Sequence, residues 1–91
     1  MAISSGMQSF QADDTTWTKI AQTDRTRRMI FLQVRLGSSP VYIYTGPDAP
    51  SKDKAIIMSA LDVLSLTQGI LDPWYILSND AGTADVLVLE G

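Results

Sequence analysis

The side chains of this chain that could take part in chemistry are carboxylates and hydroxyls, because none of its 91 residues is histidine or cysteine. Histidine is the commonest general base and the commonest transition-metal ligand, and a thiolate is both a strong nucleophile and a metal ligand. Serines are plentiful, but a serine hydroxyl needs an adjacent base before it becomes a nucleophile. These residue types argue against most hydrolytic and metal-assisted mechanisms, exclude disulfides, and predict no cofactor.

Carboxylates are the remaining route to acid–base catalysis. Six aspartates fall in segments with the composition of loops or of a chain terminus, where Asp forms turn hydrogen bonds. They are Asp13, Asp14, Asp48, Asp53, Asp72 and Asp80. An enzyme would need a perturbed carboxylate pair, for which Asp62 with Asp85 is the candidate. Glycine-rich phosphate loops and calcium-loop spacings are absent from the sequence, which therefore predicts a protein that is not an enzyme.

Aromatic and arginine side chains could bind a partner instead. Five rings could stack on sugars, although rings in a small β-protein are more often core or subunit-interface residues. They are Trp17, Tyr42, Tyr44, Trp74 and Tyr75. The only basic cluster is either a solvated face or a site for an acidic partner, and it consists of Arg25, Arg27, Arg28 and Arg35. A net charge of −3 argues against a protein that coats nucleic acid.

The segment from residue 29 to residue 45 organises the predicted elements. Ile30, Leu32, Val34 and Leu36 alternate with Met29, Phe31, Gln33 and Arg35, which predicts a strand with one buried face. Residues 41–45 form a β-branched and aromatic run, and Gly37 to Pro40 carry turn chemistry, so the two runs predict an antiparallel hairpin. In that hairpin Arg35 faces Tyr42 and Gln33 faces Tyr44, on a surface that could meet a partner.

Other short strands are predicted over residues 16–22, 74–78 and 85–90, separated by turn residues. Residues 54–67 fit either a helix capped by Ser51 or two strands, at 55–58 and 61–67. Six or seven short antiparallel strands predict an all-β fold, a small β-sandwich or flattened barrel. A single small domain of this kind has modest stability, which favours a homo-oligomer.

The first 15 residues are predicted to be a flexible N-terminal arm, with the β-sandwich domain at 16–91. Ile3, Met7 and Phe10 are spaced along a polar segment, so it is either a frayed end or an arm that docks on a neighbouring subunit. The segment contains no basic start and no long apolar run, so we expect no signal peptide. Apolar runs elsewhere are too short to cross a bilayer, and no membrane partner is expected.

Three stretches in this order resemble small structural proteins of tailed bacteriophages: RRMIFLQV, PVYIYTG and the closing WYILSNDAGTADVLVLEG. The resemblance, to capsid decoration, head-fibre base and head–tail accessory proteins, covers Trp17 to Glu90. It implies a β-sandwich and favours strands over residues 55–67. The sequence departs from the family pattern at residues 60–62, Ala-Leu-Asp, where a Pro-Gly turn would be usual.

The function expected from this resemblance is that of a non-enzymatic virion structural protein, an oligomeric capsid decoration or reinforcement protein assembled in the host cytoplasm. Its partner would be the major capsid protein or another virion protein, and the resemblance favours a trimer. Six residues are the candidates for the particle or subunit interface: Ile3, Met7, Phe10, Arg35, Tyr42 and Tyr44. The alternatives are a carbohydrate-binding module that uses surface aromatics and a head–tail or tail accessory protein.

Overall fold

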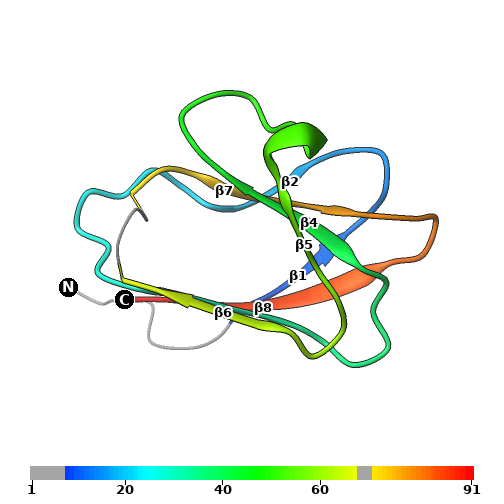
Figure 1. The fold of residues 1–91 in the computed structure, drawn as a ribbon. Coiled ribbons are helices and arrows are strands. Elements are labelled where there is room, and N and C mark those ends of the chain that lie inside the picture. The colour runs from blue at the N-terminus through cyan, green and yellow to red at the C-terminus, as the bar shows by residue number, and fades with distance from the viewer. Residues whose placement is uncertain (1–7, 68–70) are drawn as a thin grey trace.

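A computed structural model describes residues 8–67 and 71–91, which form two packed antiparallel β-sheets (Figure 1). The strands and one 3-10 turn are β1 (Gln8–Ala12), β2 (Thr18–Ala21), β3 (Ile30–Val34), β4 (Val41–Thr45), η1 (Lys52–Lys54), β5 (Ile56–Met58), β6 (Val63–Leu66), β7 (Trp74–Ser78) and β8 (Ala84–Glu90). One sheet has the order β1-β8-β3-β6 and the other β2-β7-β4-β5. The predicted all-β sandwich is confirmed, with eight strands in the described residues. Within those ranges no helix is long and apolar enough to span a membrane.

The strands of the two halves of the chain pair in nested order. β1 pairs with β8, β2 with β7, β3 with β6, and β4 with β5. This is the pattern of one long hairpin whose tip is the loop between β4 and β5. The hairpin is rolled up, because β8 also pairs with β3 and β7 also pairs with β4. Eight strands in two sheets with this order make a jelly roll.

Alternate residues of the strands fill the space between the sheets. Ile30, Leu32 and Val34 of β3 are fully buried, while Phe31 and Gln33 between them are half-buried on the outer side. The predicted alternation of β3 is therefore confirmed. The opposite sheet contributes Trp74 and Ile76 of β7, both with 2% or less of their surface exposed.

The predicted hairpin between residues 29 and 45 is wrong. β3 and β4 lie in different sheets, and residues 37–40 carry the chain from one sheet to the other. β3 is already paired on both edges, with β6 and β8, so no edge remains for β4. Gly37 has a φ of +82°, which a turn at this point requires, and Leu36 is 78% exposed instead of entering the core.

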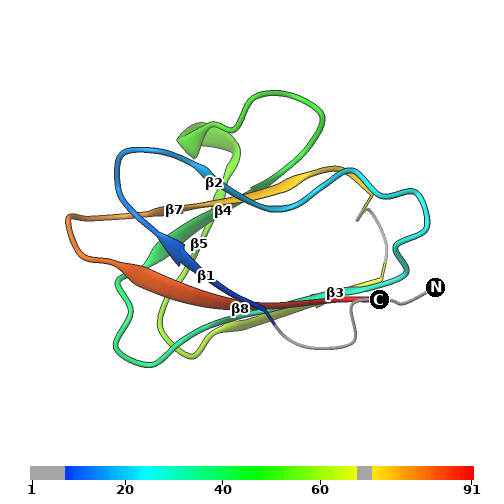
Figure 2. The same cartoon turned by 180° about the vertical axis from the view of Figure 1, so that it is seen from behind.

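The sandwich begins before residue 16, because residues 8–12 of the predicted arm form β1. This strand pairs along its length with β8, from Gln8 opposite Val88 to Ala12 opposite Ala84, and the two strands run side by side in Figure 2. Ala12 is fully buried and Phe10 packs against the core, so both side chains serve the sandwich. Ile3 and Met7 lie outside the described residues.

Residues 55–67 form the two strands β5 and β6, and the alternative helix is not present. Ser51 does act as an N-cap, because its hydroxyl accepts a hydrogen bond from the Asp53 amide at 3.2 Å. The element that it caps is η1, a single 3-10 turn. Residues 68–70, between the strands predicted at 61–67 and 74–78, lie outside the described residues.

Candidate interaction surfaces

The structure separates the predicted interface residues. Arg35 is exposed just after β3, where its amide donates to the Asp85 carbonyl at 2.9 Å. Tyr42 and Tyr44 lie on β4 in the other sheet, so Arg35 does not face them as the hairpin required. Phe10 packs on the core from β1. These side chains therefore do not form one common surface.

An aromatic face, made of Trp17, Tyr42, Tyr44 and Tyr75, covers the outer side of the β2-β7-β4-β5 sheet. The Tyr44 ring is 6.4 Å from Trp17, edge-on, and 6.2 Å from Tyr75. Lysine amines lie over two of the rings, Lys19 at 5.6 Å from Tyr75 and Lys52 at 5.5 Å from Tyr42. Cation-over-ring contacts are therefore made by lysines, and the predicted contact of Arg35 with Tyr42 is wrong.

The loop between β4 and β5 covers part of this aromatic face. It rises above the sheet and returns through η1 (Figure 1). The loop begins at Gly46, which lies against the Tyr44 ring. A Cβ at this position would be 2.7 Å from the tyrosine hydroxyl oxygen. Tyr44 is consequently buried, with 5% of its surface exposed. The rings are packed on one another and under lysines instead of standing in an open row.

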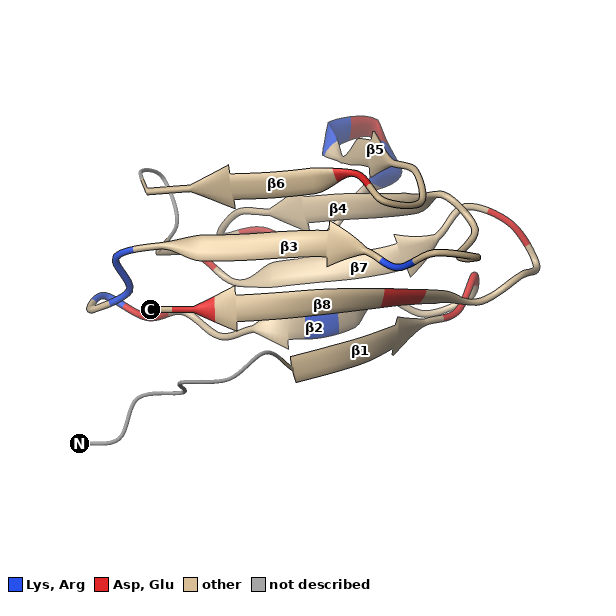
Figure 3. Ribbon diagram, turned by 90° about the horizontal axis from the view of Figure 1, so that it is seen from below, with Lys and Arg blue, Asp and Glu red and all other residues tan. Residues whose placement is uncertain are grey.

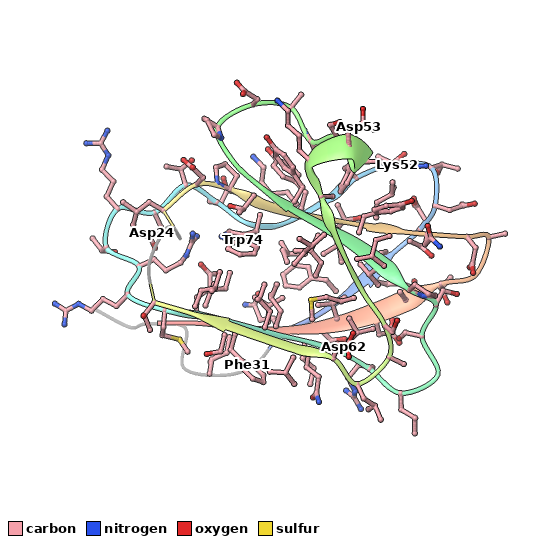
Figure 4. The ribbon with its side chains drawn as sticks, in the orientation of Figure 1. Asp24, Phe31, Lys52, Asp53, Asp62 and Trp74 are labelled. Carbon is pink, nitrogen blue, oxygen red and sulfur yellow. The ribbon has the colours of Figure 1, made fainter. Side chains whose placement is uncertain are left out.

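The outer side of the other sheet is a neutral face, made of Phe31, Gln33, Leu87 and Leu89. Phe31 lies opposite Leu89 and Gln33 opposite Leu87 on the adjacent strands β3 and β8. All four side chains are half-buried, and no element of residues 8–67 or 71–91 crosses over these strands on this side of the sheet (Figure 3). Charged residues lie near the ends of these strands, and Phe31 points away from the opposite sheet (Figure 4). This face is a strand-built surface of uncharged side chains.

An apolar edge adjoins the neutral face. The exposed large hydrophobic residues of the described chain number six, and five of them lie on β5 or β6, in the turn between them, or just after β3: Leu36, Ile56, Ile57, Leu61 and Val63. β5 and β6 are the last strands of their sheets on the same side of the sandwich (Figure 3). The Leu61 amide donates to the Val34 carbonyl at 2.8 Å, which holds the β5–β6 loop beside the end of β3.

The exposed aspartates shape turns. Backbone amides lower the pKa of Asp13, chiefly through Thr16, and that of Asp80, chiefly through Gly82, while the Thr26 hydroxyl is the main cause of the lowered pKa of Asp24. The predicted turn role of Asp13 and Asp80 is therefore confirmed.

The proposed carboxylate pair is divided by a strand. Asp62 precedes β6 and Asp85 lies on β8, and β3 runs between those two strands. The Asp62 carboxylate accepts a hydrogen bond from the Ser59 amide at 2.8 Å, which closes the β5–β6 turn. Among residues 8–67 and 71–91 no group of three or more acidic, histidine or cysteine residues could hold a metal ion.

Arg27, a member of the predicted basic cluster, lies inside the protein. Its side chain is 1% exposed, and its Nε donates to Glu90 Oε1 at 2.9 Å. The guanidinium also donates to the Asp72 carbonyl at 3.2 Å and to the Gln22 carbonyl. Arg27 therefore ties the end of β8 to the segments before β3 and β7. The other members, Arg25, Arg28 and Arg35, are exposed.

Three comparisons, with protein-family models, with curated proteins and with solved structures, find no match for this chain.

Proposed function

We propose that this chain is a non-enzymatic structural protein of a virion, and that it decorates or reinforces a bacteriophage capsid as a homo-oligomer. The observation that carries the proposal is the neutral face, an uncharged sheet surface that no other described element covers, of the kind that marks protein–protein contact. The resemblance to phage structural proteins supplies the class of partner, a capsid protein. The jelly roll supports the same reading by analogy, because viral capsid domains use this fold, although a fold alone does not fix a function.

In this proposal the neutral face packs on the capsid shell. Phe31, Leu87 and Leu89 lose water on contact, and Gln33 supplies hydrogen bonds that orient the subunit. Each contact is small, so attachment depends on several subunits that bind the repeating shell together. An oligomer is therefore part of the mechanism.

The test is co-sedimentation with particles that lack the protein. Leu87→Gln should weaken attachment about tenfold or more, because it removes apolar area from the contact. Leu71→Gln is the matched control, since Leu71 is exposed but lies outside both the neutral face and the apolar edge. Thermal unfolding of both variants checks that they fold. Equal attachment of the parent protein and Leu87→Gln would reject this face, and absence of the protein from purified virions would reject the function.

A carbohydrate-binding module is the second candidate, because the aromatic face keeps Tyr42 and Tyr75 half-buried and next to lysines. A half-exposed ring can stack on a sugar. A glycan array probed with the parent protein and with Tyr42→Ala tests this candidate, and glycan binding that the variant loses would favour it.

A further inference from the structure

We propose that the apolar edge docks a second copy of this chain about a two-fold axis, with the two β5 strands antiparallel. The inference deepens the homo-oligomer in the proposed function by naming its contact surface and its symmetry. The dimer that it gives differs from the trimer that the phage resemblance favours.

The first observation is that this edge of the sandwich is unprotected. Among the described strands, β5 pairs only with β4 and β6 only with β3, so each has one side without a described strand neighbour. Their sequences, IIM and VLSL, contain no charge and no proline. Natural sheets guard their edges with lysine, proline or a bulge, because an open apolar edge pairs with another chain.

The opposite edge of the sandwich shows that protection. β1 is largely polar, with the sequence QSFQA, and β2 carries the exposed Lys19. The pairing of β2 with β7 also shifts register between Lys19 and Ala21, which is the signature of a bulge. The edge formed by β1 and β2 therefore carries features that prevent pairing with another chain, and the edge formed by β5 and β6 lacks them.

The second copy is the partner that this asymmetry favours. A head-to-tail contact needs two different complementary surfaces, whereas a two-fold contact needs one surface that complements itself. Five of the six exposed large hydrophobic residues in the described ranges belong to the one edge, and Leu71 stands apart from it. A two-fold contact therefore covers the whole group in both copies.

Charges at the two ends of β5 fit an antiparallel arrangement. Lys52, Asp53 and Lys54 precede β5 in η1, and Asp62 lies beyond its other end (Figure 4). The η1 turn carries a net charge of +1 from two lysines and one aspartate, and Asp62 carries −1. Antiparallel β5 strands bring the η1 turn of each copy toward Asp62 of the other, which aligns opposite charges.

Leu61 gives an independent reason. Its φ of +72° lies in the left-handed region, where a leucine is strained and a glycine is relaxed. The side chain is nevertheless 56% exposed in the single chain, so burial within that chain does not compensate the strain. Strain of this kind is kept where a side chain is needed, and the β5–β6 turn places Leu61 at the apolar edge.

The first experiment measures mass against concentration by analytical ultracentrifugation of the full chain. We expect twice the 9.9 kDa mass of one chain. Ile57→Glu places a charge at the middle of β5 in both copies and should weaken the dimer about 100-fold or more. Leu71→Glu makes the same change away from the edge and should leave the dimer intact. A monomeric parent, a trimeric parent, or a dimeric Ile57→Glu variant would each overturn the proposal.

A cross-link tests the symmetry directly, because the chain contains no cysteine. The axis passes near the middle of β5, so Ile57→Cys should bring two thiols within disulfide reach and give a covalent dimer on mild oxidation. Leu71→Cys should stay largely uncross-linked. Equal cross-linking of the two variants would contradict a contact at β5.

Leu61→Gly separates an interface role from a structural one. Relief of the left-handed strain should leave the thermal midpoint of the monomer equal or higher, measured at concentrations where the chain is monomeric. Loss of the leucine side chain should weaken the dimer about tenfold. A variant that is less stable and equally dimeric would assign Leu61 to the fold and remove it from the interface.

The alignment of the η1 turn with Asp62 of the other copy is tested by reversing one charge. Lys54→Glu should weaken the dimer, and added salt should restore it in part because it screens the new repulsion with Asp62. Arg25→Glu makes the same change in net charge at an exposed site far from β5 along the chain and should have no such effect. A Lys54→Glu dimer as tight as the parent would reject the antiparallel alignment.

Particle attachment is measured separately, so the two proposals can fail separately. A dimer that does not bind particles would leave this inference standing and reject the capsid function. A chain that binds particles as a trimer would reject this inference and leave the capsid function standing, and binding as a monomer would reject both this inference and the oligomer in the proposed function.

Discussion

At the scale of single residues, Arg27 has a structural role that its neighbours in the sequence do not share. Its guanidinium bonds one carboxylate and two carbonyls from segments far apart in the chain. We expect Arg27→Met to lower the free energy of unfolding by about 3 kcal/mol, the low end for a broken buried pair, because Glu90 is 30% exposed. Chemical denaturation measures this loss, and Arg28→Met, at an exposed position, should change stability by less than about 0.5 kcal/mol.

Val34 tests the buried face of β3. It is fully buried, so Val34→Asp places a carboxylate among apolar side chains and should abolish cooperative unfolding. Gln33→Asp puts the same group on the outer side of the strand and should fold. Circular dichroism melts compare the two variants, and a cooperative melt of Val34→Asp would contradict the register of β3.

Acid should weaken the fold through the turn aspartates. Asp13, Asp24 and Asp80 have folded pKa values below the ordinary 3.8, because hydrogen bonds favour their charged forms. A depressed folded pKa stabilises the protein above the unfolded pKa, and that stabilisation is lost as the pH falls through the folded value. Denaturant melts from pH 5 downward should therefore show stability falling below about pH 4. Asp13→Asn should make the fall in unfolding free energy with decreasing pH shallower. The same fall as in the parent for Asp13→Asn, Asp24→Asn and Asp80→Asn would contradict the stabilising role of these aspartates.

The buried face of β3 could be predicted from the sequence, because alternation is a local property of the strand. The burial of Arg27 could not, since its partner Glu90 is 63 residues away. The lysines over Tyr42 and Tyr75 were missed for the same reason, because strand pairing and the β4–β5 loop bring them there.

At the scale of elements, the ranges of the later strands could be predicted and their partners could not. Residues 41–45 and 74–78 are strands with the predicted bounds. The turn residues between β3 and β4 indicate a reversal of the chain, but not whether the next strand joins the same sheet. That choice depends on β8, which occupies the edge of β3 from far along the sequence.

β1 was missed because QSFQA contains a single strong strand-forming residue. A chain that starts at Thr15 loses this strand, together with the burial of Ala12 and Phe10. We expect it to unfold at a much lower temperature or to lack cooperative folding. Calorimetry compares the two chains. Equal melting of the parent and the shorter chain would show that β1 contributes little to the sandwich.

At the scale of the whole molecule, nested pairing makes nearly every sheet contact a distant one in sequence. Gln8 lies opposite Val88, and Ile30 lies opposite Glu90. Loop closure must precede such pairing, so we expect refolding in milliseconds to seconds, as for other β-sandwiches. Stopped-flow fluorescence of Trp74, which is buried in the core, follows the reaction. Refolding in microseconds would contradict this topology.

The same nesting has a consequence for synthesis on the ribosome. β7 is the strand between β2 and β4, and β8 is the strand between β1 and β3, so the two sheets receive inner strands last. A nascent chain that ends before β7 can assemble only the pairs β3–β6 and β4–β5, with their inward side chains open to water. The sandwich therefore forms only after β8 has left the exit tunnel. Until then, the nascent chain exposes to water the apolar side chains that fill the core of the finished sandwich.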